Sequence, residues 1–440
     1  MNRFEKYSSY KDSGVEWLGE IPEHWESQKM KYLGKMFAGL TDKKGDDFAK
    51  EISEDKMPFI PFTNVCNNLK IDKNQMQYVK IKPYEKQNKV QKNDIIFLMS
   101  SETLDDIGKC SIHLDEEQFY LNSFCKGFRP KTFAVNAEFL NYLLQSKTYR
   151  NYFALVGRGF TRINIKQEYI NDLFTVLPLK EEQTKIASFL DEKTAKIDEV
   201  ISQKQKLIEL LKEQKQIVIN DAVTKGLDKN VEFVDSGVEW IGKIPKHWNV
   251  EKGKRLFQQM KRPVREQDEI VTCFRDGEVT LRTNRRTDGF TNALKEHGYQ
   301  GIRKGDFVIH NMDAFAGAIG ISDSDGKSTP VYSVCRPWDE NIVFSEYYAR
   351  YLRNLALQDF ILSLAKGIRE RSTDFRFKDF GELEYPLPPK DEQIQIVEYI
   401  ENQTTKIDKA IELQQNYISK LKEYKVSLID SVVTGKVRVV

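Results

Sequence analysis

The clearest pattern along the chain is a long run of apolar residues spaced alternately by three and four positions. It lies within residues 180–226, which contain no proline and no internal glycine. Such a heptad spacing predicts one continuous helix with an apolar seam. About 45 residues at about 1.5 Å per residue give a helix of roughly 65–70 Å. The apolar seam members are Leu190, Ile197, Ile201, Ile208, Leu211, Val218 and Ala222.

The same seam returns 210 positions later, and its members are Ile400, Ile407, Ile411, Ile418, Leu421, Leu428 and Val432. A lone helix of this length cannot bury its stripe, so the two matching helices are candidate partners. A coiled coil between two chains would satisfy the same pattern. We favour antiparallel pairing within the chain, which would place the intervening segments at opposite ends of a rod. Lys204 and Lys215 are unfavourable on a tight seam, and we expect them to fix register or orientation.

Two short segments frame each half of the chain. DSGVEWLGEIPEHW at 12–25 recurs as DSGVEWIGKIPKHW at 235–248, with eleven of fourteen positions identical. LPLKEEQ at 177–183 recurs as LPPKDEQ at 387–393. The long segments between these frames match poorly. A chain that keeps a frame and varies two inserts is typical of a holder for two independently specified binding heads.

We therefore divide the chain into four parts. Residues 1–176 form a first head with its frame, 177–230 a first long helix, 231–386 a second head with its frame, and 387–440 a second long helix. Because long helices and strand-rich inserts alternate along the chain, the expected class is a mixed α+β fold.

Both inserts show short strand-like runs separated by turn residues, and these predict α/β heads with a mostly antiparallel, curved sheet. The expected strands are 59–65, 77–81, 94–98 and 110–114 in the first insert, and 270–275, 306–310 and 318–322 in the second. Helical patterns follow at 137–156 and 345–365. The inserts share a faint pattern, since 90–97 parallels 302–309 and 124–130 loosely parallels 332–337.

Composition is that of an ordinary soluble protein, with 40% hydrophobic and 30% charged residues. The most apolar stretches are too short to cross a bilayer. The first eleven residues are polar, so we expect no signal segment and a cytoplasmic location. Five cysteines without a Cys-x-x-Cys spacing argue against a zinc site and a disulfide framework. With a net charge of +2, any nucleic-acid role must come from local basic clusters.

Basic residues concentrate in the two inserts. Residues 147–166 carry five Lys or Arg and no acid, and 252–304 carry thirteen against seven Asp or Glu. Most such clusters are solvated charged faces. Here they recur in both inserts at matching places, and arginine suits bidentate phosphate and guanine contacts, so we predict DNA contact. The candidates are Arg158, Arg162, Lys166, Lys261, Arg262, Arg282, Arg285, Arg286, Arg369, Arg371 and Arg376.

No catalytic constellation stands out, and we predict neither catalytic nor metal-binding residues. The chain lacks the Asn/Asp-Pro-Pro-aromatic loop with which an adenine methyltransferase holds a flipped base, and it lacks a dinucleotide-binding glycine motif. Residues 320–328 resemble a phosphate loop, but the spacing is one residue too long and two aspartates would repel phosphate, so we predict a turn between strands. For His24 and His247, each before a tryptophan, we expect packing or capping roles.

The frame also carries two tryptophans per copy: Trp17 and Trp25, then Trp240 and Trp248. Their rings would dock a short segment on a surface. That surface is either the chain's own helices or a partner protein, since aromatic residues are favoured at interface hot spots. All four are therefore candidate partner-binding residues.

The two frames, the helix starts LPLKEEQTKI and LPPKDEQIQI, and the helix ends at 221–226 and 430–435 together resemble the specificity (S) subunit of type I restriction-modification systems. The resemblance covers essentially the whole chain. It implies two target recognition domains joined by two long antiparallel helices in a pseudo-twofold arrangement. Each domain would read one half of a split, asymmetric DNA site, and the helices would set the distance between the halves. The loop 38–44 loosely matches a glycine-rich loop near DNA in that family, which adds Lys43 and Lys44 to the candidates.

The resemblance also implies partners, namely two modification (methyltransferase) subunits and, in the full enzyme, restriction subunits. S-adenosylmethionine, ATP and Mg²⁺ would belong to those partners, and this chain would be non-catalytic and without a cofactor. The alternative is a coiled-coil scaffold whose inserts bind protein, which predicts no salt-steep DNA affinity. An enzyme with a hidden site in one insert would instead show activity as the purified chain. A specificity protein used only with a methyltransferase would share these sequence features.

Overall fold

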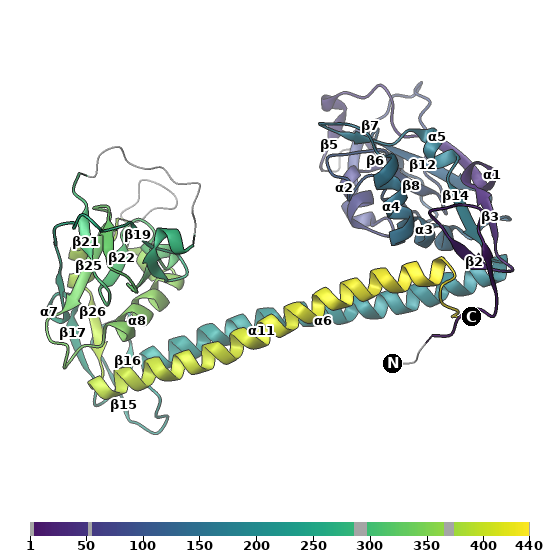
Figure 1. Ribbon diagram of the computed structural model, residues 1–440. Coiled ribbons are helices and arrows are strands. Elements are labelled where there is room, and N and C mark those ends of the chain that lie inside the picture. Colours follow the sequence, from purple (N-terminus) through teal and green to yellow (C-terminus); the bar gives the residue numbers. More distant parts are fainter. Residues whose placement is uncertain (1–3, 52–54, 286–296, 365–373, 440) are drawn as a thin grey trace. The chain divides into compact units, whose positions relative to one another are not determined.

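The computed structural model describes residues 4–51, 55–285, 297–364 and 374–439. The chain divides into two compact units, Met1–Lys204 with Asn416–Val440, and Gln205–Gln415. Each unit holds one head and a part of each long helix (Figure 1). Among the described helices, none combines the length and the apolarity that a bilayer-spanning segment needs.

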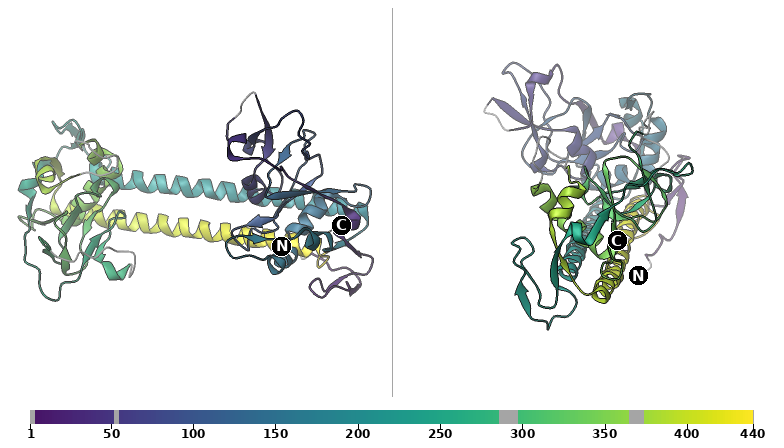
Figure 2. Two further views of the ribbon diagram at one scale, coloured as in Figure 1. Left: turned by 90° about the horizontal axis from the view of Figure 1, so that it is seen from above. Right: turned by 90° about the vertical axis from the view of Figure 1, so that its left-hand side faces the viewer.

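Both predicted long helices are continuous: α6 spans Lys180–Lys225 and α11 spans Lys390–Val433. Every seam position is buried or half-buried in both helices. Within each unit, the part of α6 and the part of α11 lie side by side (Figures 1 and 2) and run antiparallel. In the second unit, for example, Lys215 of α6 pairs with Asp408 of α11, while Gly226, directly after the end of α6, lies against Glu392 near the start of α11. Pairing within the chain is therefore confirmed in each unit.

Lys215 and the residue 210 positions later, Lys425, form reciprocal ion pairs with aspartates of the other helix, whereas Lys204 lies over the ring of Tyr417. In the first unit Lys425 Nζ lies 2.6 Å from Asp198 Oδ2, and in the second unit Lys215 Nζ lies 2.7 Å from Asp408 Oδ2. The carboxylates are 57% and 56% exposed, so each pair contributes at most about 1 kcal/mol. Because each pair forms in one alignment of the helices, we interpret both as register contacts rather than as a main source of stability.

The first head contains two four-stranded sheets. The antiparallel sheet β10-β8-β12-β4 consists of β4 (Gly34–Ala38), β8 (Ile95–Leu98), β10 (Cys110–Ile112) and β12 (Cys125–Pro130). The sheet β11-β6-β7-β5 consists of β5 (Phe48–Ala49), β6 (Lys56–Ile60), β7 (Gln77–Lys80) and β11 (Tyr120–Leu121). Strand β8 is buried on both faces: Ile95 and Phe97 join the core formed with α3 (Ala137–Gln145) and α4 (Lys147–Val156), and Ile96 and Leu98 join a second cluster.

The second head repeats the central sheet of the first. Its order is β23-β22-β25-β18, all antiparallel, with β18 (Phe257–Gln259), β22 (Phe307–His310), β23 (Ile319–Ile321) and β25 (Tyr332–Pro337). Phe307 and Ile309 pack towards α8 (Ser345–Leu357), and Val308 packs on the opposite face. The two parallels seen in the sequence thus correspond to β8 with β22 and to β12 with β25. The mixed α+β class with two long helices is confirmed.

The remaining elements complete the two units. In the first they are β1 (Tyr10–Asp12), β2 (Glu20–Pro22), β3 (Glu26–Lys29), α1 (Met30–Leu33), η1 (Gly45–Asp47), α2 (Phe62–Asn67), η2 (Lys73–Gln75), β9 (Ser100–Ser101), β13 (Ile163–Asn164), α5 (Gln167–Asn171) and β14 (Phe174–Leu177). In the second they are β15 (Phe233–Asp235), β16 (Lys243–Pro245), β17 (Asn249–Lys252), α7 (Gly253–Leu256), β19 (Val271–Cys273), β20 (Val279–Leu281), η3 (Arg282–Asn284), β21 (Gln300–Ile302), η4 (Ala314–Ala316), β24 (Gly326–Ser328), α9 (Phe360–Ser363), α10 (Phe377–Glu382) and β26 (Glu384–Leu387). Strand β3 pairs with β14, and β17 pairs with β26, so the chain enters and leaves each head through neighbouring antiparallel strands.

Three sequence-based elements are corrected. The strand expected at 59–65 ends at Ile60 and continues as helix α2. The helix expected at 137–156 is interrupted at Ser146, whose extended backbone separates α3 from α4. The helix expected at 345–365 ends at Leu357, because Asp359 takes a left-handed conformation with φ of 62° before the short helix α9.

A buried aspartate secures the central sheet of each head. In the second head the side chain of Asp306 is 0% exposed and accepts hydrogen bonds from the guanidinium groups of Arg262 and Arg336. In the first head Asp94, 1% exposed, binds Arg129 through both carboxylate oxygens. Since a buried charge needs compensation by a partner, removing one member of either cluster should destabilise the sheet.

The Asp306→Asn variant tests this requirement. Asparagine keeps the size but removes the charge that balances two partly buried guanidinium groups, so unfolding of the second unit should become easier by about 3–5 kcal/mol. Hydrogen exchange of the β22 and β25 amides in the full chain measures the change. The control is Asp325→Asn, which removes the charge of a half-exposed partner of Arg265 and should have a much smaller effect. Equal effects of the two variants would contradict a structural role for Asp306.

Candidate nucleic-acid interface

The first frame is anchored to a glutamate in the first turn of α6. Trp25 is fully buried, and its indole Nε1–H donates to Glu182 Oε1 over 3.3 Å. His24 Nε2 lies 2.9 Å from Glu182 Oε2, and the hydroxyl of Tyr7 donates to Glu182 Oε1 over 2.7 Å. Burial raises the pKa of Tyr7, and the hydrogen bond to Glu182 raises it further. The carboxylate of Glu182 therefore contacts three aromatic side chains of the N-terminal segment.

The second frame repeats this arrangement on α11. Trp248 Nε1–H donates to Glu392 Oε2 over 3.0 Å, and His247 Nε2 lies 2.8 Å from the same oxygen. The packing role expected for both histidines agrees with these contacts. The His-Trp pair thus contacts the glutamate of the helix start in both units. We call this contact the joint between frame and helix, and both of its parts recur in the sequence.

The next residue of each helix start orients the head on its helix. Gln183 is buried, and its Oε1 accepts from the backbone N–H of Asn136, the N-cap of α3, over 2.8 Å. Gln393 is also buried and accepts from the backbone N–H of Phe344, directly before α8, over 2.8 Å. Both amides also donate to backbone carbonyls, so each buried polar group is satisfied.

Each frame also receives the end of the other long helix. Gly226 follows α6 with φ of +73°, and a Cβ there would lie 2.7 Å from Glu392 Oε1 and 3.1 Å from the ring of Trp248. Gly435 follows α11 with φ of +75°, and a Cβ there would lie 3.3 Å from the ring of Trp25. A glycine is needed at both places for the backbone conformation and for the close approach.

The four frame tryptophans all have partners within the chain. Trp17 stacks on Tyr152 at 4.9 Å between ring centroids, and Trp240 stacks on Phe360 at 4.7 Å. Trp25 and Trp248 are 0% and 4% exposed. Because buried rings offer no surface, Trp25 and Trp248 dock on the chain's own helices, and the expectation that they bind a partner is corrected.

Three predicted cations of the first head are exposed and carry uncompensated charge. Arg158 and Arg162 lie on the loop after α4, and Lys166 precedes α5. Within the described residues, none of the three forms an ion pair with a carboxylate. Arg158 bonds only to backbone carbonyls, and the guanidinium of Arg162 lies 4.9 Å from the ring centroid of Phe124. These groups are free to meet an anionic ligand.

The two lysines suggested by the loop at 38–44 differ from each other. The side chain of Lys43 is 3% exposed and forms an ion pair with Glu85. It therefore holds two loops of the head together and does not face a ligand. Lys44 is exposed and stays a candidate.

In the second head, Lys261 is exposed and Arg282 is half-buried, with its Nε–H donating to Thr272 Oγ1 over 3.3 Å. Arg262 is bound to the buried Asp306, so its role is structural. Charge clustering in the sequence could not separate these cases, because Asp306 is 44 residues from Arg262.

Two further candidates are paired at the surface. Arg285 forms ion pairs with Asp276 and Glu278 and lies 4.2 Å from the ring centroid of Phe274. Arg376 is exposed and pairs with Asp374 over 2.8 Å. Such exposed pairs are weak, so both arginines can exchange their partners for phosphates. Arg286, Arg369 and Arg371 lie outside the described residues.

One exposed aromatic residue was missed by the sequence analysis. Phe160, between Arg158 and Arg162, is fully exposed, and Phe124 nearby is 47% exposed. The only signal in the sequence is an aromatic residue between two arginines in a glycine-containing loop, Gly-Arg-Gly-Phe-Thr-Arg at 157–162.

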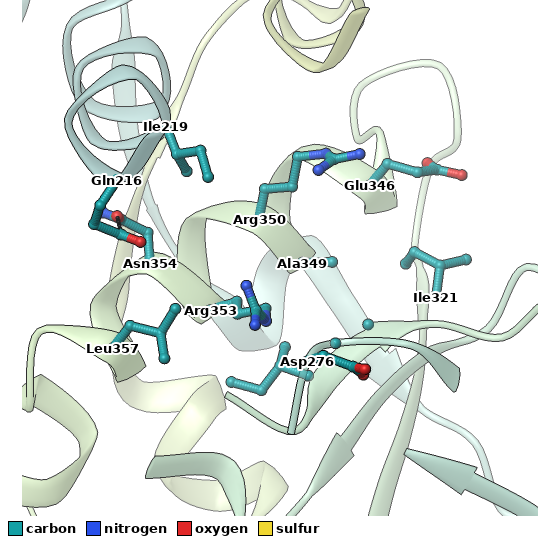
Figure 3. A pocket seen from close by; sticks show the side chains of 13 residues that line it. Gln216, Ile219, Asp276, Ile321, Glu346, Ala349, Arg350, Arg353, Asn354 and Leu357 are labelled. Carbon is teal, nitrogen blue, oxygen red and sulfur yellow. Dashed lines mark hydrogen bonds between the residues drawn. The ribbon is translucent and has the colours of Figure 1, made fainter. Parts of the chain in front are cut away.

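The second unit contains a cavity of about 230 Å³ between α6, α8 and the sheet (Figure 3). Its two arginines are already engaged, since Arg350 pairs with Glu401 and Arg353 donates to the carbonyls of Gly317 and Arg275. Among the described residues that line it, there is no serine, threonine, cysteine or lysine. Burial lowers the pKa of Arg353. The lining therefore offers no nucleophile with a general base, and we interpret the cavity as a packing gap beside α8.

The described residues also contain no group of His, Cys, Asp and Glu that could hold a metal ion. Burial raises the pKa of the Cys110 thiol to about 12, which keeps it protonated and unreactive. The segment resembling a phosphate loop connects β23 to β24, as predicted, and Asp325 within it binds Arg265.

Residues 22–210 match a family described as "Type I restriction modification DNA specificity domain". The StySPI type I restriction enzyme specificity subunit of Salmonella potsdam is 25% identical over 222 residues, which are 50% of this chain and 47% of that protein. The EcoKI specificity subunit of Escherichia coli (strain K12) is 27% identical over 206 residues, 47% of this chain and 44% of that protein. The alignments thus span about half the length of these curated relatives.

Two solved structures share the fold. One, from work on complex assembly and conformational transition of the type I R-M system, has a TM-score of 0.69 at 14% identity and covers 94% of this chain and 98% of its own. The other, the HsdS subunit of Thermoanaerobacter tengcongensis, has a TM-score of 0.57 at 16% identity and covers 95% and 98%. At these identities the likeness concerns the fold alone.

The joint between frame and helix can be tested with Glu392→Ala. The variant leaves the buried indole N–H of Trp248 without an acceptor, which should destabilise the second unit by about 1–3 kcal/mol. Asp391→Ala is a matched control, since it removes the neighbouring exposed carboxylate from the same helix turn and causes the same loss of charge near the helix N-terminus. Hydrogen exchange should show loosening around β17 and α11 for Glu392→Ala only. Equal loosening in both variants would assign the effect to helix charge.

Proposed function

We propose that the chain is the DNA-specificity subunit of a type I restriction-modification enzyme, because residues 22–210 match the family of type I restriction modification DNA specificity domains. The observation that carries this proposal is the repeated head. Two sheets of the same order stand on two copies of one frame, and the exposed cations around them differ. The chain itself is non-catalytic and supplies sequence recognition to catalytic partners.

Each head reads one half of a split DNA site. The first head presents Lys44, Arg158, Arg162 and Lys166, and the second presents Lys261, Arg282, Arg285 and Arg376. Because these sets stand on different loops and have different neighbours, the two half-sites differ in sequence and the whole site is asymmetric. Cations bind phosphates and set the position of the head, and guanidinium groups also suit guanine edges in the major groove.

The long helices set the spacing between the two halves. They are unbroken over 46 and 44 residues, and their seams are tied by the ion pairs of Asp198 and Asp408. A continuous helix is stiff at this length, so the number of residues in it sets the distance along DNA between the two half-sites.

The partners are two modification (methyltransferase) subunits and, in a complete enzyme, restriction subunits. S-adenosylmethionine, ATP and Mg²⁺ act in those partners, and this chain carries no cofactor of its own. The repeated frame offers two like surfaces, as two copies of one partner need. The long helices also expose large hydrophobic side chains that a partner could cover, namely Val200, Leu207, Leu210, Ile217, Tyr399, Leu413, Tyr417, Tyr424 and Val426.

The direct test is a methylome. The chain is co-expressed with a type I modification subunit, and methylated adenines are mapped across the host genome. We expect one split, asymmetric motif with a fixed spacer. Loss of charge at Arg162 should weaken recognition of one half-site only. A stable complex without any methylated motif would favour the alternative of a scaffold whose inserts bind protein.

The spacing role predicts a second result. A paired deletion removes seven residues from the 199–214 segment of α6 and seven from the 409–424 segment of α11. This deletion keeps the seams in phase and shortens each helix by about 10 Å. At about 3.4 Å per base pair, the spacer of the methylated motif should shorten by up to about three base pairs. Deleting four residues from α6 alone puts the seams out of phase and should abolish assembly. A motif with unchanged spacing after the paired deletion would contradict the helices as a ruler.

A further inference from the structure

The loop between α4 and β13 presents a single aromatic ring to solvent. Backbone hydrogen bonds close the loop at its base, from Arg158 N–H to the Asn164 carbonyl over 3.1 Å and from Asn164 N–H to the Arg158 carbonyl over 2.8 Å. Phe160 stands between these points and is fully exposed. Gly159 has φ of +143°, and a Cβ there would collide with the carbonyl oxygen of Arg162, so the tight bend before Phe160 requires glycine.

The base of the loop is held by the head's own strands. Ile163 pairs with Ser101, and the N–H of Ile165 donates to the carbonyl of Met99 over 3.0 Å. The N–H of Met99 in turn donates to the carbonyl of Phe124 over 3.1 Å. The exposed ring is therefore carried on a fixed support, which reduces the ordering cost of binding.

The surroundings of Phe160 are positive. Arg158 and Arg162 lie two residues to either side, Lys166 follows, and none of the three is neutralised by a carboxylate within the described residues. In the neighbouring acidic segment at 102–106, Asp106 is bound by Lys109 and Thr103, and within the described residues Glu102 and Asp105 form no ion pair with these cations. The exposed ring makes no packing contact and lies between free cations. This arrangement fits a ligand that has stacked apolar faces with anions on either side.

Resting on the proposed function, we propose that Phe160 is an aromatic wedge that inserts into the base stack of the half-site read by the first head. Arg158 and Arg162 contact the phosphates on either side of the opened step. Apolar side chains that enter a base step unstack it and bend the duplex, so the half-site gains selectivity for a step that unstacks easily. The wedge adds shape recognition to the base-edge contacts of the same head.

Charge favours DNA over a protein as the ligand of this loop. Duplex DNA carries one negative charge per about 1.7 Å of its axis, so it can meet several uncompensated cations at once. Around Phe160 the ring is surrounded by cations, which is the composition of surfaces that stack on nucleic-acid bases while they follow a phosphate backbone.

The experiment uses the full chain in complex with a modification subunit and a duplex carrying the motif from its methylome. 2-Aminopurine is placed in turn at positions of the first head's half-site. We expect one step outside the methylated adenine to gain fluorescence on binding, and we expect Phe160→Ala to remove this gain and weaken binding roughly 5- to 100-fold. Fluorescence at the methylated adenine, which the catalytic subunit takes out of the stack, should persist.

Matched variants separate stacking from charge. Phe160→Ala should leave the salt dependence of binding unchanged, whereas Arg162→Ala should reduce its slope by about 1. Phe160→Trp should retain the fluorescence gain. Phe133→Ala removes another exposed phenylalanine of the same unit, which is 79% exposed and whose nearest cation along the chain, Lys131, donates to the carbonyl of Tyr32; this variant should bind as the unaltered complex does.

Three results would overturn the wedge while leaving the proposed function intact. One is unchanged affinity and fluorescence of Phe160→Ala. Another is that Phe160→Ala weakens binding without any fluorescence change, and that replacing thymine by uracil in the DNA weakens binding of the unaltered complex to the same extent. That result would assign Phe160 to contact with a thymine methyl group. The third is impaired assembly with the modification subunit at unchanged DNA affinity, which would assign the ring to a protein partner. Absence of site-specific binding by the unaltered complex would overturn both the wedge and the specificity function.

Discussion

The structure depends on one hydrogen-bonded joint that occurs twice: a glutamate in the first turn of a long helix that receives the side chains of a His-Trp pair. Glu182 holds Trp25 in the first unit, and Glu392 holds Trp248 in the second. A charged acceptor for an indole N–H in a largely buried place is a strong contact, and its loss leaves the donor unsatisfied. The adjacent glutamine then fixes the start of the head's main helix. Two consecutive residues thus determine how a head is attached to its helix.

Antiparallel pairing follows from the same joint. Each frame holds the start of one long helix through the glutamate and receives the glycine-terminated end of the other, at Gly226 or Gly435. Parallel helices would bring two starts to one frame and two ends to the other, and neither set of contacts could form. The exposed pairs of Lys215 and Lys425 adjust the register but are too weak to choose the direction.

Features that repeat or recur periodically could be predicted from the sequence, because each is encoded locally. The two seams, the frames, the packing roles of His24 and His247, and strands β8 and β22 are of this kind. Contacts between distant residues could not be predicted. Lys43 and Arg262 belong to basic clusters in the sequence, yet Glu85 and Asp306 bind them within the fold. The breaks at Ser146 and Asp359 depend on single backbone conformations that leave no mark in a hydrophobic pattern. Phe160 was missed because exposure cannot be inferred from residue type.

The antiparallel pairs β3-β14 and β17-β26 have a consequence for how this kind of chain can evolve. Since each head begins and ends on hydrogen-bonded neighbours, everything between the two strands can be replaced without changing the geometry of its attachment. A gene that exchanges this cassette by recombination at the short repeated segments acquires a new recognition surface in one step. The contacts of Glu182 and Glu392 with the frames are left unchanged by such an exchange. The order of segments along the chain thus allows a head to change while its frame stays the same.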